Sequence, residues 1–403
     1  MQKRLSSAVV GLGATLFLAI STASAVLGAP DLRTIYETQK LIAPDPDAGD
    51  RFGTAVSVSG NLAIVGSKYD DVGTGAFIGS ASIYAFDGTS WNFQAKLSAS
   101  DGVGFGYFGS AVAISGNMVL VGAPSDSTVG LGSGAVYVFI FDGTAWNQQA
   151  KIVDPNEAGG SQFGFSIALS GNTALIGAWN DNNKGAGYIF TFDGTAWSEQ
   201  AKLTASDGEL SDLFGWSVSL SENRALVGAY ENDSFTGAAY VFSFDGSTWS
   251  QEAKLTGLDV RVGDRFGWAV SISGDVALVG APDRGHARGA AYIFGFDGAT
   301  WTQQTKLTIS GATPADSFGS SVVLSDRVAL IGAHRLYDSG GVYEFSLRRN
   351  VWTLRVQLLA SDGMAGDYLG VSVALSGNTV LAGADDTFTS NGTGNAYIFS
   401  LGR

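Results

Sequence analysis

Apolar and polar residues follow one pattern that repeats seven times along the chain. In the copy at 214–255, the first segment alternates apolar with small polar residues, which is the period of a β-strand. A polar turn leads to a second, mostly apolar segment, and the third places aromatic residues at alternate positions. Asp245-Gly246 is a strong hairpin signal before the fourth segment, which begins at Trp249. The pattern predicts four antiparallel strands in each copy.

Two glycine-containing anchors stand at a fixed distance in every copy. A Phe-Gly pair opens six copies, Leu369-Gly370 opens the seventh, and a second glycine follows each opening Phe or Leu after fourteen residues. Only the step from this second glycine to a Tyr of the third strand (Ser82 in the first copy) varies, between 11 and 16 residues. Repeats of 51 to 56 residues that cannot bury a face alone indicate a propeller or a solenoid. We expect function in the connection whose length varies, because the remainder is scaffold.

The two ends of the repeat array complement each other. The seventh copy ends after its third segment, at Ala396–Leu401, and has no fourth. The stretch Ile35–Leu41 resembles the fourth segment Trp91–Leu97, and it precedes Phe52 by the same seventeen residues that separate each Trp from the next anchor. An N-terminal strand that completes the last blade would close the ring and remove its open edges. We therefore predict an all-β, seven-bladed propeller with four antiparallel strands in each blade.

The first 25 residues have the features of a secretory signal peptide. Lys3 and Arg4 precede an apolar run, and Ala23-Ser24-Ala25 is a small-residue cleavage site. The sequence thus predicts a signal peptide at 1–25 and one propeller domain at 26–403. We expect the mature protein to be secreted, periplasmic or on the cell surface.

Composition narrows the classes of partner and chemistry. The chain has no Cys, which excludes disulfides, a thiol nucleophile and thiolate metal ligands. Its formal net charge of −14 argues against nucleic acid and anionic membrane surfaces, which select for basic patches. No stretch after the signal peptide is long and apolar enough to span a bilayer, so membrane insertion is not expected.

The anchors resemble a known signature, the FG-GAP repeats of the integrin alpha-subunit propeller and its bacterial relatives. The literal form occurs as Phe108-Gly109 with Gly122-Ala123-Pro124, and as Phe266-Gly267 with Gly280-Ala281-Pro282. The resemblance covers essentially the whole chain after the signal peptide and implies the propeller fold. Repeats of the integrin type often carry a D-x-D-x-D-G calcium loop. Here that place is taken by short turns such as Ser59-Gly60-Asn61, so these calcium sites do not carry over.

Candidate ligand-binding residues lie in the loops between the second and third strands. Because strands alternate in direction, these 2–3 loops share one face with the connections that lead to the next blade. Aromatics beside amides and carboxylates suit binding of a sugar or a peptide; the alternative is a solvated loop whose aromatic packs on its neighbour. The candidates are Tyr69, Asp70, Trp179, Asn180, Asp181, Tyr230 and Glu231.

Blades five and six carry a local reversal of charge on the same face. In an acidic chain, clustered Arg and His predict an anionic ligand such as a carboxylate or an acidic sugar. The alternative is ion pairing with nearby Asp259, Asp264, Asp283 and Asp316. The candidates are Arg284, His286, Arg288, His334, Arg335 and Tyr337.

Two series of Asp residues recur seven and two residues before the opening anchor. They could form a ring of carboxylates for Ca²⁺ or a cationic ligand, or could bond backbone N–H groups of their own loops, which constant spacing favours. Asp45, Asp47 and Asp50 are a separate candidate Ca²⁺ site, since three carboxylates can chelate a hard cation. We interpret six lysines at one position of the fourth strand as protection of the outer edge.

The leading functional hypothesis is a secreted, non-catalytic propeller of the binding or adhesion type. It would recognise a protein or a carbohydrate through its 2–3 loop face and would need no cofactor. One alternative is a carbohydrate-active hydrolase with its site on blades five and six, although no catalytic residues stand out from the background. A second alternative is a purely structural surface module.

Overall fold

A computed structural model describes most of the chain after its first 31 residues. The described residues are 32–71, 76–102, 104–156, 159–283, 285, 288–310, 316–386 and 392–402. The predicted signal peptide at 1–25 therefore lies outside them, as do Arg284 and His286. Arg33–Arg403 forms one compact unit.

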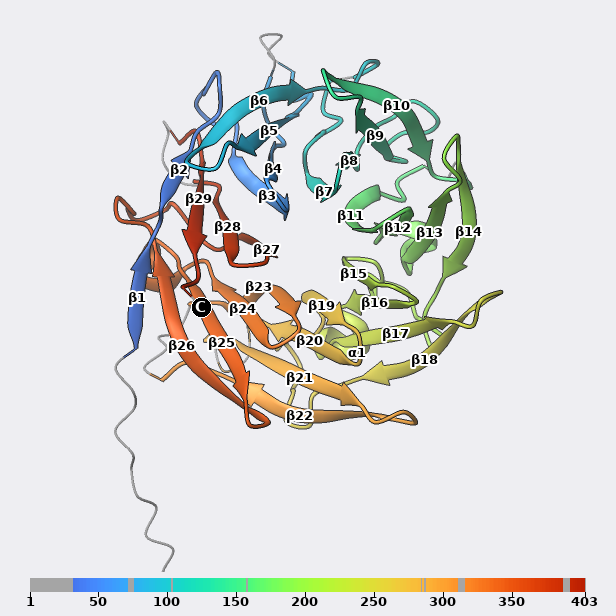
Figure 1. The fold of residues 1–403 in the computed structure, drawn as a ribbon. Helices are drawn as coiled ribbons and strands as arrows, with labels where there is room; N and C mark the ends of the chain where they lie inside the picture. Colours follow the sequence, from blue (N-terminus) through green and yellow to red (C-terminus); the bar gives the residue numbers. More distant parts are fainter. Residues whose placement is uncertain are drawn as a thin grey trace, which may run out of the picture. The chain divides into compact units, whose positions relative to one another are not determined.

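Seven β-sheets are arranged in a ring around a central axis (Figure 1), which confirms the predicted seven-bladed propeller. Blade one consists of β3 (Phe52–Ser59), β4 (Leu62–Ser67), β5 (Ser80–Phe86) and β6 (Trp91–Leu97), and blade two of β7 (Ala111–Ser115), β8 (Met118–Ala123), β9 (Ala135–Phe141) and β10 (Trp146–Val153). Blade three consists of β11 (Phe163–Ser170), β12 (Thr173–Ala178), β13 (Ala186–Phe192) and β14 (Trp197–Leu203), and blade four of β15 (Ser217–Ser221), β16 (Arg224–Ala229), β17 (Ala238–Phe244) and β18 (Trp249–Leu255). Blade five consists of β19 (Ala269–Ser273), β20 (Val276–Ala281), β21 (Ala290–Phe296) and β22 (Trp301–Leu307), and blade six contains β23 (Phe318–Ser325), β24 (Val328–Ala333), β25 (Val342–Arg348) and β26 (Val351–Leu359). Blade seven contains β27 (Ser372–Ser376), β28 (Thr379–Ala384) and β29 (Asn395–Ser400).

The N-terminal segment closes the ring, as predicted, but it does so as two strands. β2 (Gln39–Leu41) pairs antiparallel with β29 and supplies the fourth strand of blade seven. β1 (Arg33–Tyr36) instead pairs parallel with β26 and becomes a fifth strand of blade six. The single predicted strand Ile35–Leu41 is thus divided, because Ile35 pairs with Leu358 in blade six.

The two glycine anchors interlock neighbouring blades. Gly267, in the Phe-Gly pair of blade five, has a left-handed φ of 92°. Its carbonyl oxygen lies so close to Gly228 of blade four that a β-carbon on Gly228 would stand within 3.0 Å of it, nearer than side chains tolerate. The same relation joins every neighbouring pair of blades, including Gly383 of blade seven with Gly53 of blade one. The FG-GAP spacing is therefore a packing requirement between blades.

Aromatic side chains form the core between the sheets. The anchor Phe of each of blades one to six is buried and packs edge-on against aromatics of the third strand. In blade five, Phe266 lies 5.4 Å from Tyr292 and 6.0 Å from Phe294, measured between ring centroids. Serines of the innermost strands link blades near the axis; for example, the backbone N–H of Val270 donates to Ser217 Oγ at 3.1 Å. These Ser contacts explain why the innermost strands are rich in small polar residues.

In blades one, two, four, five and seven, a lysine of the outer strand forms an ion pair with the connection from the preceding blade. Lys254 Nζ lies 2.6 Å from Asp207 Oδ2, and Tyr240 donates its hydroxyl to Asp207 Oδ1 at 2.9 Å. Equivalent pairs join Lys40 with Asp362, Lys96 with Asp45, Lys151 with Asp101, and Lys306 with Asp259. Edge protection is therefore an incomplete interpretation of these lysines, because they also fasten the connections between blades.

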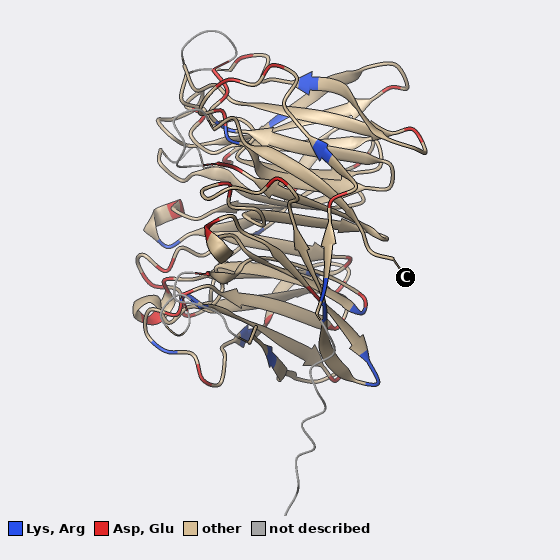
Figure 2. Cartoon of the chain, turned by 90° about the vertical axis from the view of Figure 1, so that its left-hand side faces the viewer, with Lys and Arg blue, Asp and Glu red and all other residues tan. Residues whose placement is uncertain are grey.

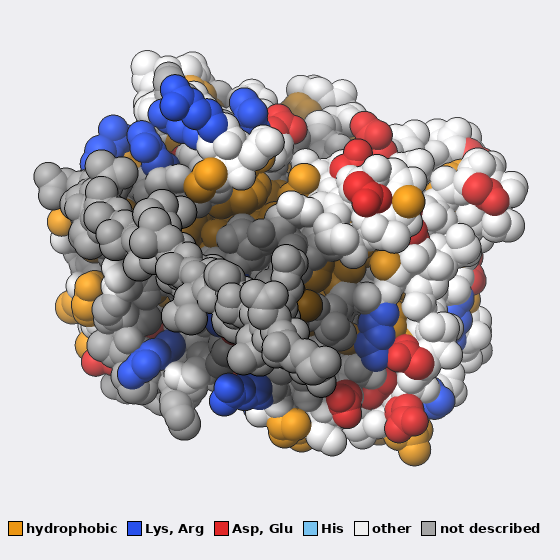
Figure 3. Space-filling model, turned by 90° about the horizontal axis from the view of Figure 1, so that it is seen from below, with side chains coloured by type: hydrophobic (Ala, Val, Ile, Leu, Met, Phe, Trp, Pro, Cys, Tyr) orange, Lys and Arg blue, Asp and Glu red, His pale blue; other side chains and the backbone are white. Residues whose placement is uncertain are grey.

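Charged positions are spread over the ring. When the ring is seen from its side, the strands run between its two faces, and acidic positions occur along both faces (Figure 2). On the side wall in Figure 3, the visible apolar side chains lie among charged ones. No helix among the described residues is long and apolar enough to cross a membrane.

Candidate functional site

Five aromatic side chains gather on the loop face of blades three, four and five, and we call them the aromatic rim. Phe165, Trp216 and Trp268 each directly follow the Phe-Gly pair of their blade. Trp179 and Tyr230 directly follow β12 and β16, at the first position of their 2–3 loops. Both positions lie at the loop-face ends of inner strands, so five residues from three blades converge near the axis.

Trp216 is the centre of the aromatic rim. Its ring centroid lies 4.5 Å from that of Phe165, 4.8 Å from that of Tyr230 and 5.1 Å from that of Trp268. Trp179 completes the group at 6.1 Å from both Phe165 and Trp216. Most of these rings meet at tilted or edge-to-face angles, which aromatic pairs prefer.

The aromatic rim is only partly buried, unlike the aromatic core between the blades. Phe165, Trp179, Trp216 and Trp268 keep intermediate exposure, whereas Tyr230 is 7% exposed. The indole nitrogen of Trp179 is buried and has no hydrogen-bond partner among the described residues. Burial and the neighbouring Glu231 carboxylate raise the pKa of Tyr230 above its ordinary value, so its hydroxyl stays protonated.

One charged pair borders the aromatic rim. The Arg265 guanidinium lies over the rings of Tyr230 and Trp268, at 5.7 and 5.5 Å from their centroids. Its Nε is 3.2 Å from Asp283 Oδ2, so the charge is balanced locally. The arrangement offers flat apolar surface with donors at its border, which suits stacking and hydrogen bonding.

Tyr69, also predicted from the sequence, lies in a second aromatic group where blades seven, one and two meet. It contacts Tyr107 and Phe77, each at 5.4 Å between ring centroids. The guanidinium of Arg51 lies 4.7 Å from the centroid of the Tyr69 ring. The residues of this second group come from other blades than the residues of the aromatic rim.

The acidic candidates of the 2–3 loops bind the scaffold. Asp70 is buried and accepts from Ser80 Oγ at 2.5 Å, with Lys96 Nζ at 2.6 Å. Asp181, in the short helix η1 (Asp181–Asn183), accepts from Tyr188 and from Lys202 Nζ. Both carboxylates therefore fix the loop onto the outer strands.

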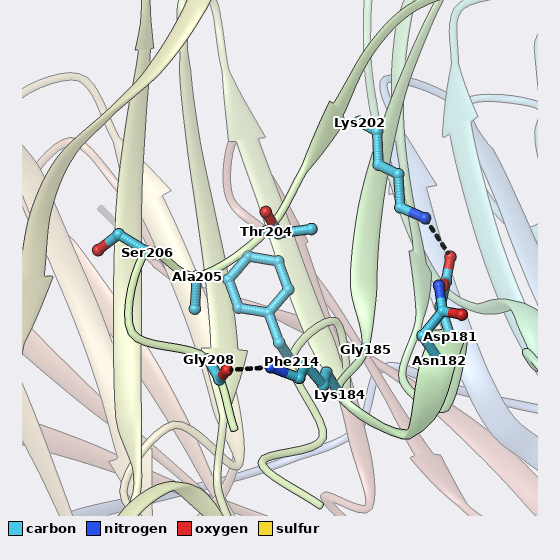
Figure 4. Close-up of a pocket in the computed structure, with 10 residues that line it drawn as sticks. All are labelled: Asp181, Asn182, Lys184, Gly185, Lys202, Thr204, Ala205, Ser206, Gly208 and Phe214. Carbon is cyan, nitrogen blue, oxygen red and sulfur yellow. Dashed lines mark hydrogen bonds and ion pairs between the residues drawn. The ribbon is translucent and has the colours of Figure 1, made fainter. Parts of the chain in front are cut away.

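Figure 4 shows Asp181 at one side of a cavity of about 310 Å³ between blades three and four. Lys202 reaches Asp181 at 2.8 Å on one side. Lys184 reaches the carbonyl oxygen of Gly208 at 2.8 Å on the other. Because both ammonium groups already have partners, this cavity is a weaker candidate than the aromatic rim.

The remaining loop candidates beside the aromatic rim have structural neighbours. Asn180 donates from Nδ2 to the carbonyl oxygen of Gly160 at 2.7 Å, which ties η1 to the preceding connection. Glu231 stands at the N-terminal end of the short helix α1 (Asn232–Phe235), directly after Tyr230. Asn180 thus helps to hold the loop that carries Trp179.

Asp45, Asp47 and Asp50 do not converge on one point. Asp45 pairs with Lys96 at 2.7 Å, and Asp50 Oδ2 accepts the backbone N–H of Asp47 at 2.9 Å. Among the described residues, no group of three or more His, Asp or Glu side chains is placed to hold a metal ion. Ca²⁺ binding at this loop stays a prediction from the sequence.

The two repeated Asp series have different partners. The series two residues before the anchor bonds its own loop: Asp212, Asp264 and Asp367 each accept the backbone N–H three residues earlier. The series seven residues before the anchor bonds Lys and Tyr side chains, as Asp207 does. The expectation that these Asp residues bond backbone N–H groups of their own loops therefore holds for the first series. It did not foresee the Lys and Tyr partners of the second series.

The described members of the blade-five and blade-six candidates are not joined by a hydrogen bond or a ring contact. His334 is partly buried and packs against Tyr368, 5.7 Å between ring centroids. Arg288, Arg335 and Tyr337 are exposed, the last two at the short helix η2 (Leu336–Asp338). Ion pairing with one of the Asp residues named for this region occurs at Arg265, in the connection that precedes blade five, which pairs with Asp283.

Sequence reasoning missed three of the five rings of the aromatic rim. Phe165, Trp216 and Trp268 lie in parts of fixed length, which were assigned to the scaffold. A signal was present: the residue after the opening anchor is Thr, Ser, Phe, Trp, Trp, Ser and Val in blades one to seven. An alignment of the seven copies would have shown that three consecutive blades, three to five, carry an aromatic residue at this position.

Comparison with known proteins supports the repeat assignment. The model of the FG-GAP repeat matches seven successive segments, at 36–86, 91–139, 146–190, 197–242, 249–294, 301–345 and 352–399. No curated protein matches the chain. A chain in a solved structure described as "Crystal Structure of Mitotic Checkpoint Complex" is similar over 99% of this chain and 100% of that chain. At 13% identity and a TM-score of 0.56, this similarity shows the propeller fold alone. With seven matched repeats that cover the whole ring, the chain belongs to the FG-GAP repeat family.

Proposed function

We propose that this chain is an exported, non-catalytic recognition propeller that binds a protein or a glycan through its 2–3 loop face. The observation that carries the proposal is the aromatic rim. Four large rings keep partial exposure there, although the same propeller buries its anchor Phe residues completely or nearly so. Clustered, partly exposed aromatics are enriched where proteins bind ligands, because each ring supplies a large contact area at small entropic cost.

The surroundings of the aromatic rim support recognition. Arg265 and Asp283 balance each other, so the bordering charge pair favours neither a strongly anionic nor a strongly cationic ligand. The loop carboxylates Asp70 and Asp181 are held by Lys and Tyr or Ser partners and serve the scaffold. Export is proposed from the N-terminal sequence alone.

The test is binding by matched tryptophan variants. The protein would be screened on a printed glycan array and against a displayed library of random peptides, first as wild type and then as Trp216→Ala. Trp249→Ala is the control, because Trp249 is also partly exposed but stacks on Phe244 in a hairpin of the opposite face. Circular dichroism and thermal melting would establish that both variants fold.

We expect saturable binding in one of the two screens, lost in Trp216→Ala and kept in Trp249→Ala. Loss of a single interface aromatic of this kind commonly weakens binding by about 10-fold or more. Absence of saturable binding in both screens would overturn the proposal. So would binding that is equally strong in the folded Trp216→Ala variant.

A further inference from the structure

A second pocket lies on the same face, where blades seven, one and two meet, and we call it the blade-one pocket. It has a volume of about 420 Å³, and its side-chain walls are Arg51, Tyr69, Phe77, Tyr107 and Asp386. Small-molecule sites typically begin at about 300 Å³, so the space suits one or two sugar rings. None of these five residues belongs to the aromatic rim.

Aromatic rings form one wall of the blade-one pocket. Tyr69 contacts both Phe77 and Tyr107 at 5.4 Å, and Phe77 continues to Phe105 at 5.8 Å, measured between ring centroids. Phe77 is 42% exposed and Phe105 is 56% exposed. Phe77 lines the pocket and therefore presents apolar surface to a ligand, and Phe105 extends this surface beyond the lining residues.

The backbone holds two walls in an unusual conformation. Arg51 and Tyr107 each directly precede a Phe-Gly pair, and their φ angles are 56° and 58°. All seven residues at this repeat position are non-glycine with positive φ; the others are Gln162, Leu213, Arg265, Ser317 and Tyr368. Left-handed non-glycine residues persist where the surrounding structure fixes them, so this position presents a variable side chain from a rigid support.

The charged side chains that line the blade-one pocket are Arg51 and Asp386, a donor and an acceptor of opposite charge. The Arg51 guanidinium stacks on Tyr69 and has no hydrogen bond or ion pair with another described residue, so its N–H groups are available. Asp386 supplies carboxylate oxygens, which can accept several hydrogen bonds at once. Their charges cancel, which disfavours a purely anionic or purely cationic ligand.

A second pair of opposite charges stands beside Arg51 at equivalent repeat positions. Lys68 directly follows β4, and Asp385 directly follows β28. Asp385 is 4% exposed, and its Oδ1 has no hydrogen-bond partner among the described residues. Burial lowers the pKa of Lys68 and raises that of Asp385, while each of the two charges offsets part of this effect on the other. An incompletely bonded buried carboxylate is a recurrent feature of functional sites.

We propose that the blade-one pocket binds a neutral pyranose, as the terminal sugar of a glycan. The apolar face of the ring would lie against Phe77 and Tyr107, and neighbouring hydroxyls would accept from Arg51 and donate to Asp386. A hydroxyl group is both donor and acceptor, so a neutral sugar satisfies both charged walls without burying a net charge. This proposal rests on the loop face being the binding face, but it uses residues outside the aromatic rim.

The test uses the methyl glycosides of glucose, galactose, mannose and N-acetylglucosamine, with glucuronic acid and glucosamine as charged comparisons. Binding to the full chain would be followed by saturation-transfer NMR and calorimetry. Arg51→Met keeps an unbranched stem on Tyr69 and removes the donors, and Asp386→Asn removes the acceptor charge. Trp249→Ala, in a hairpin of the opposite face, is the control, and Trp216→Ala tests the aromatic rim as the alternative site.

We expect one of the neutral glycosides to bind saturably and more tightly than both charged sugars. Arg51→Met and Asp386→Asn should each weaken it about 10-fold or more, whereas Trp249→Ala should leave it unchanged. Failure of all four neutral glycosides to bind, or preference for a charged sugar, would overturn the proposal. Neutral-sugar binding that is lost in Trp216→Ala and kept in Arg51→Met would place the sugar on the aromatic rim, which contradicts this inference and supports the proposed function.

Discussion

The carbonyl oxygen of Gly267 occupies the space that a β-carbon of Gly228 would need. This contact joins blade four to blade five, and its six equivalents join the rest of the ring. The second anchor glycine is therefore required by the distance between backbones. Its own φ is not in the left-handed region, so packing alone accounts for the requirement.

Gly228→Ala should strongly destabilise the protein. The methyl group overlaps a backbone oxygen that cannot rotate away, so two blades must separate locally; we expect a loss of about 3 kcal/mol or more in the free energy of unfolding. Gly159→Ala is the matched control, because a β-carbon there meets its nearest atom at 3.5 Å and φ is also outside the left-handed region. Chemical denaturation of both variants checks the prediction, and similar midpoints would contradict it.

The fold was predictable from the sequence because it depends on contacts that repeat. Fixed spacing between Phe266 and Gly280, copied seven times, reflects one packing relation between neighbouring blades. Ring closure followed from a missing strand at one end and a matching strand at the other. The split of this strand into β1 and β2 was not predictable, since it depends on the free edge of β26 accepting a parallel partner.

The candidate site was less accessible to sequence reasoning. Trp179 and Tyr230 were found because they stand in loops of variable length. Trp216 and Trp268 were missed because they stand in scaffold positions, about 50 residues apart, and meet only when neighbouring blades converge on the axis. Loop length identifies where insertions are tolerated, whereas a shared surface also depends on which strand ends the ring brings together.

Two lysines of the same repeat position should differ in their contribution to stability. Lys151 lies 3.1 Å from Asp126 Oδ2, a carboxylate that is 2% exposed, whereas Lys254 pairs with the half-exposed Asp207. Removing Lys151 leaves a buried charge without its cation, so Lys151→Met should cost about 2–4 kcal/mol. Lys254→Met should cost at most about 1 kcal/mol, because solvent screens an exposed pair.

Thermal and denaturant unfolding of both variants would measure this difference. Adding Asp126→Asn to Lys151→Met should recover a large part of the loss, since the uncompensated charge is then gone. Equal losses for the two single variants, or no recovery in the double variant, would contradict the assignment of Asp126 as the group that depends on Lys151.

The two N-terminal strands should differ in importance for the ring. A chain that begins at Glu37 loses β1 but keeps β2 paired with β29, so the ring stays closed. A chain that begins at Ile42 also loses Leu41, which is 2% exposed, and the ion pair between Lys40 and Asp362. It exposes the edge of β29, and open edges promote association between chains. We expect a large drop in melting temperature and self-association for the second truncation only.

Size-exclusion chromatography and thermal melting of the two truncated chains provide the measurement. The first truncation is the control for simple shortening of the N-terminus. Comparable destabilisation of both chains would mean that β1 on blade six, and not β2 on blade seven, dominates closure.

His334 should make stability depend on pH between about 4 and 6.5. Burial, reinforced by the neighbouring Arg335 cation, lowers the pKa of His334 to about 4. Between this value and the ordinary pKa of about 6.5, the unfolded chain binds a proton that the folded chain excludes. The free energy of unfolding contributed by this residue is therefore fully present above pH 6.5 and falls as the pH drops towards 4.

The prediction is checked by comparing wild type with His334→Phe, which keeps a ring against Tyr368 and removes the titrating group. Wild type should lose about 1–2 kcal/mol more than the variant between pH 7 and pH 4, allowing for partial exposure of the imidazole. Asp50 titrates in the same range with the opposite sign, since burial raises its pKa to about 6. Because Asp50 is present in both chains, its effect cancels in the difference. Parallel pH profiles for the two proteins would show that His334 is protonated as readily in the folded state as in the unfolded state.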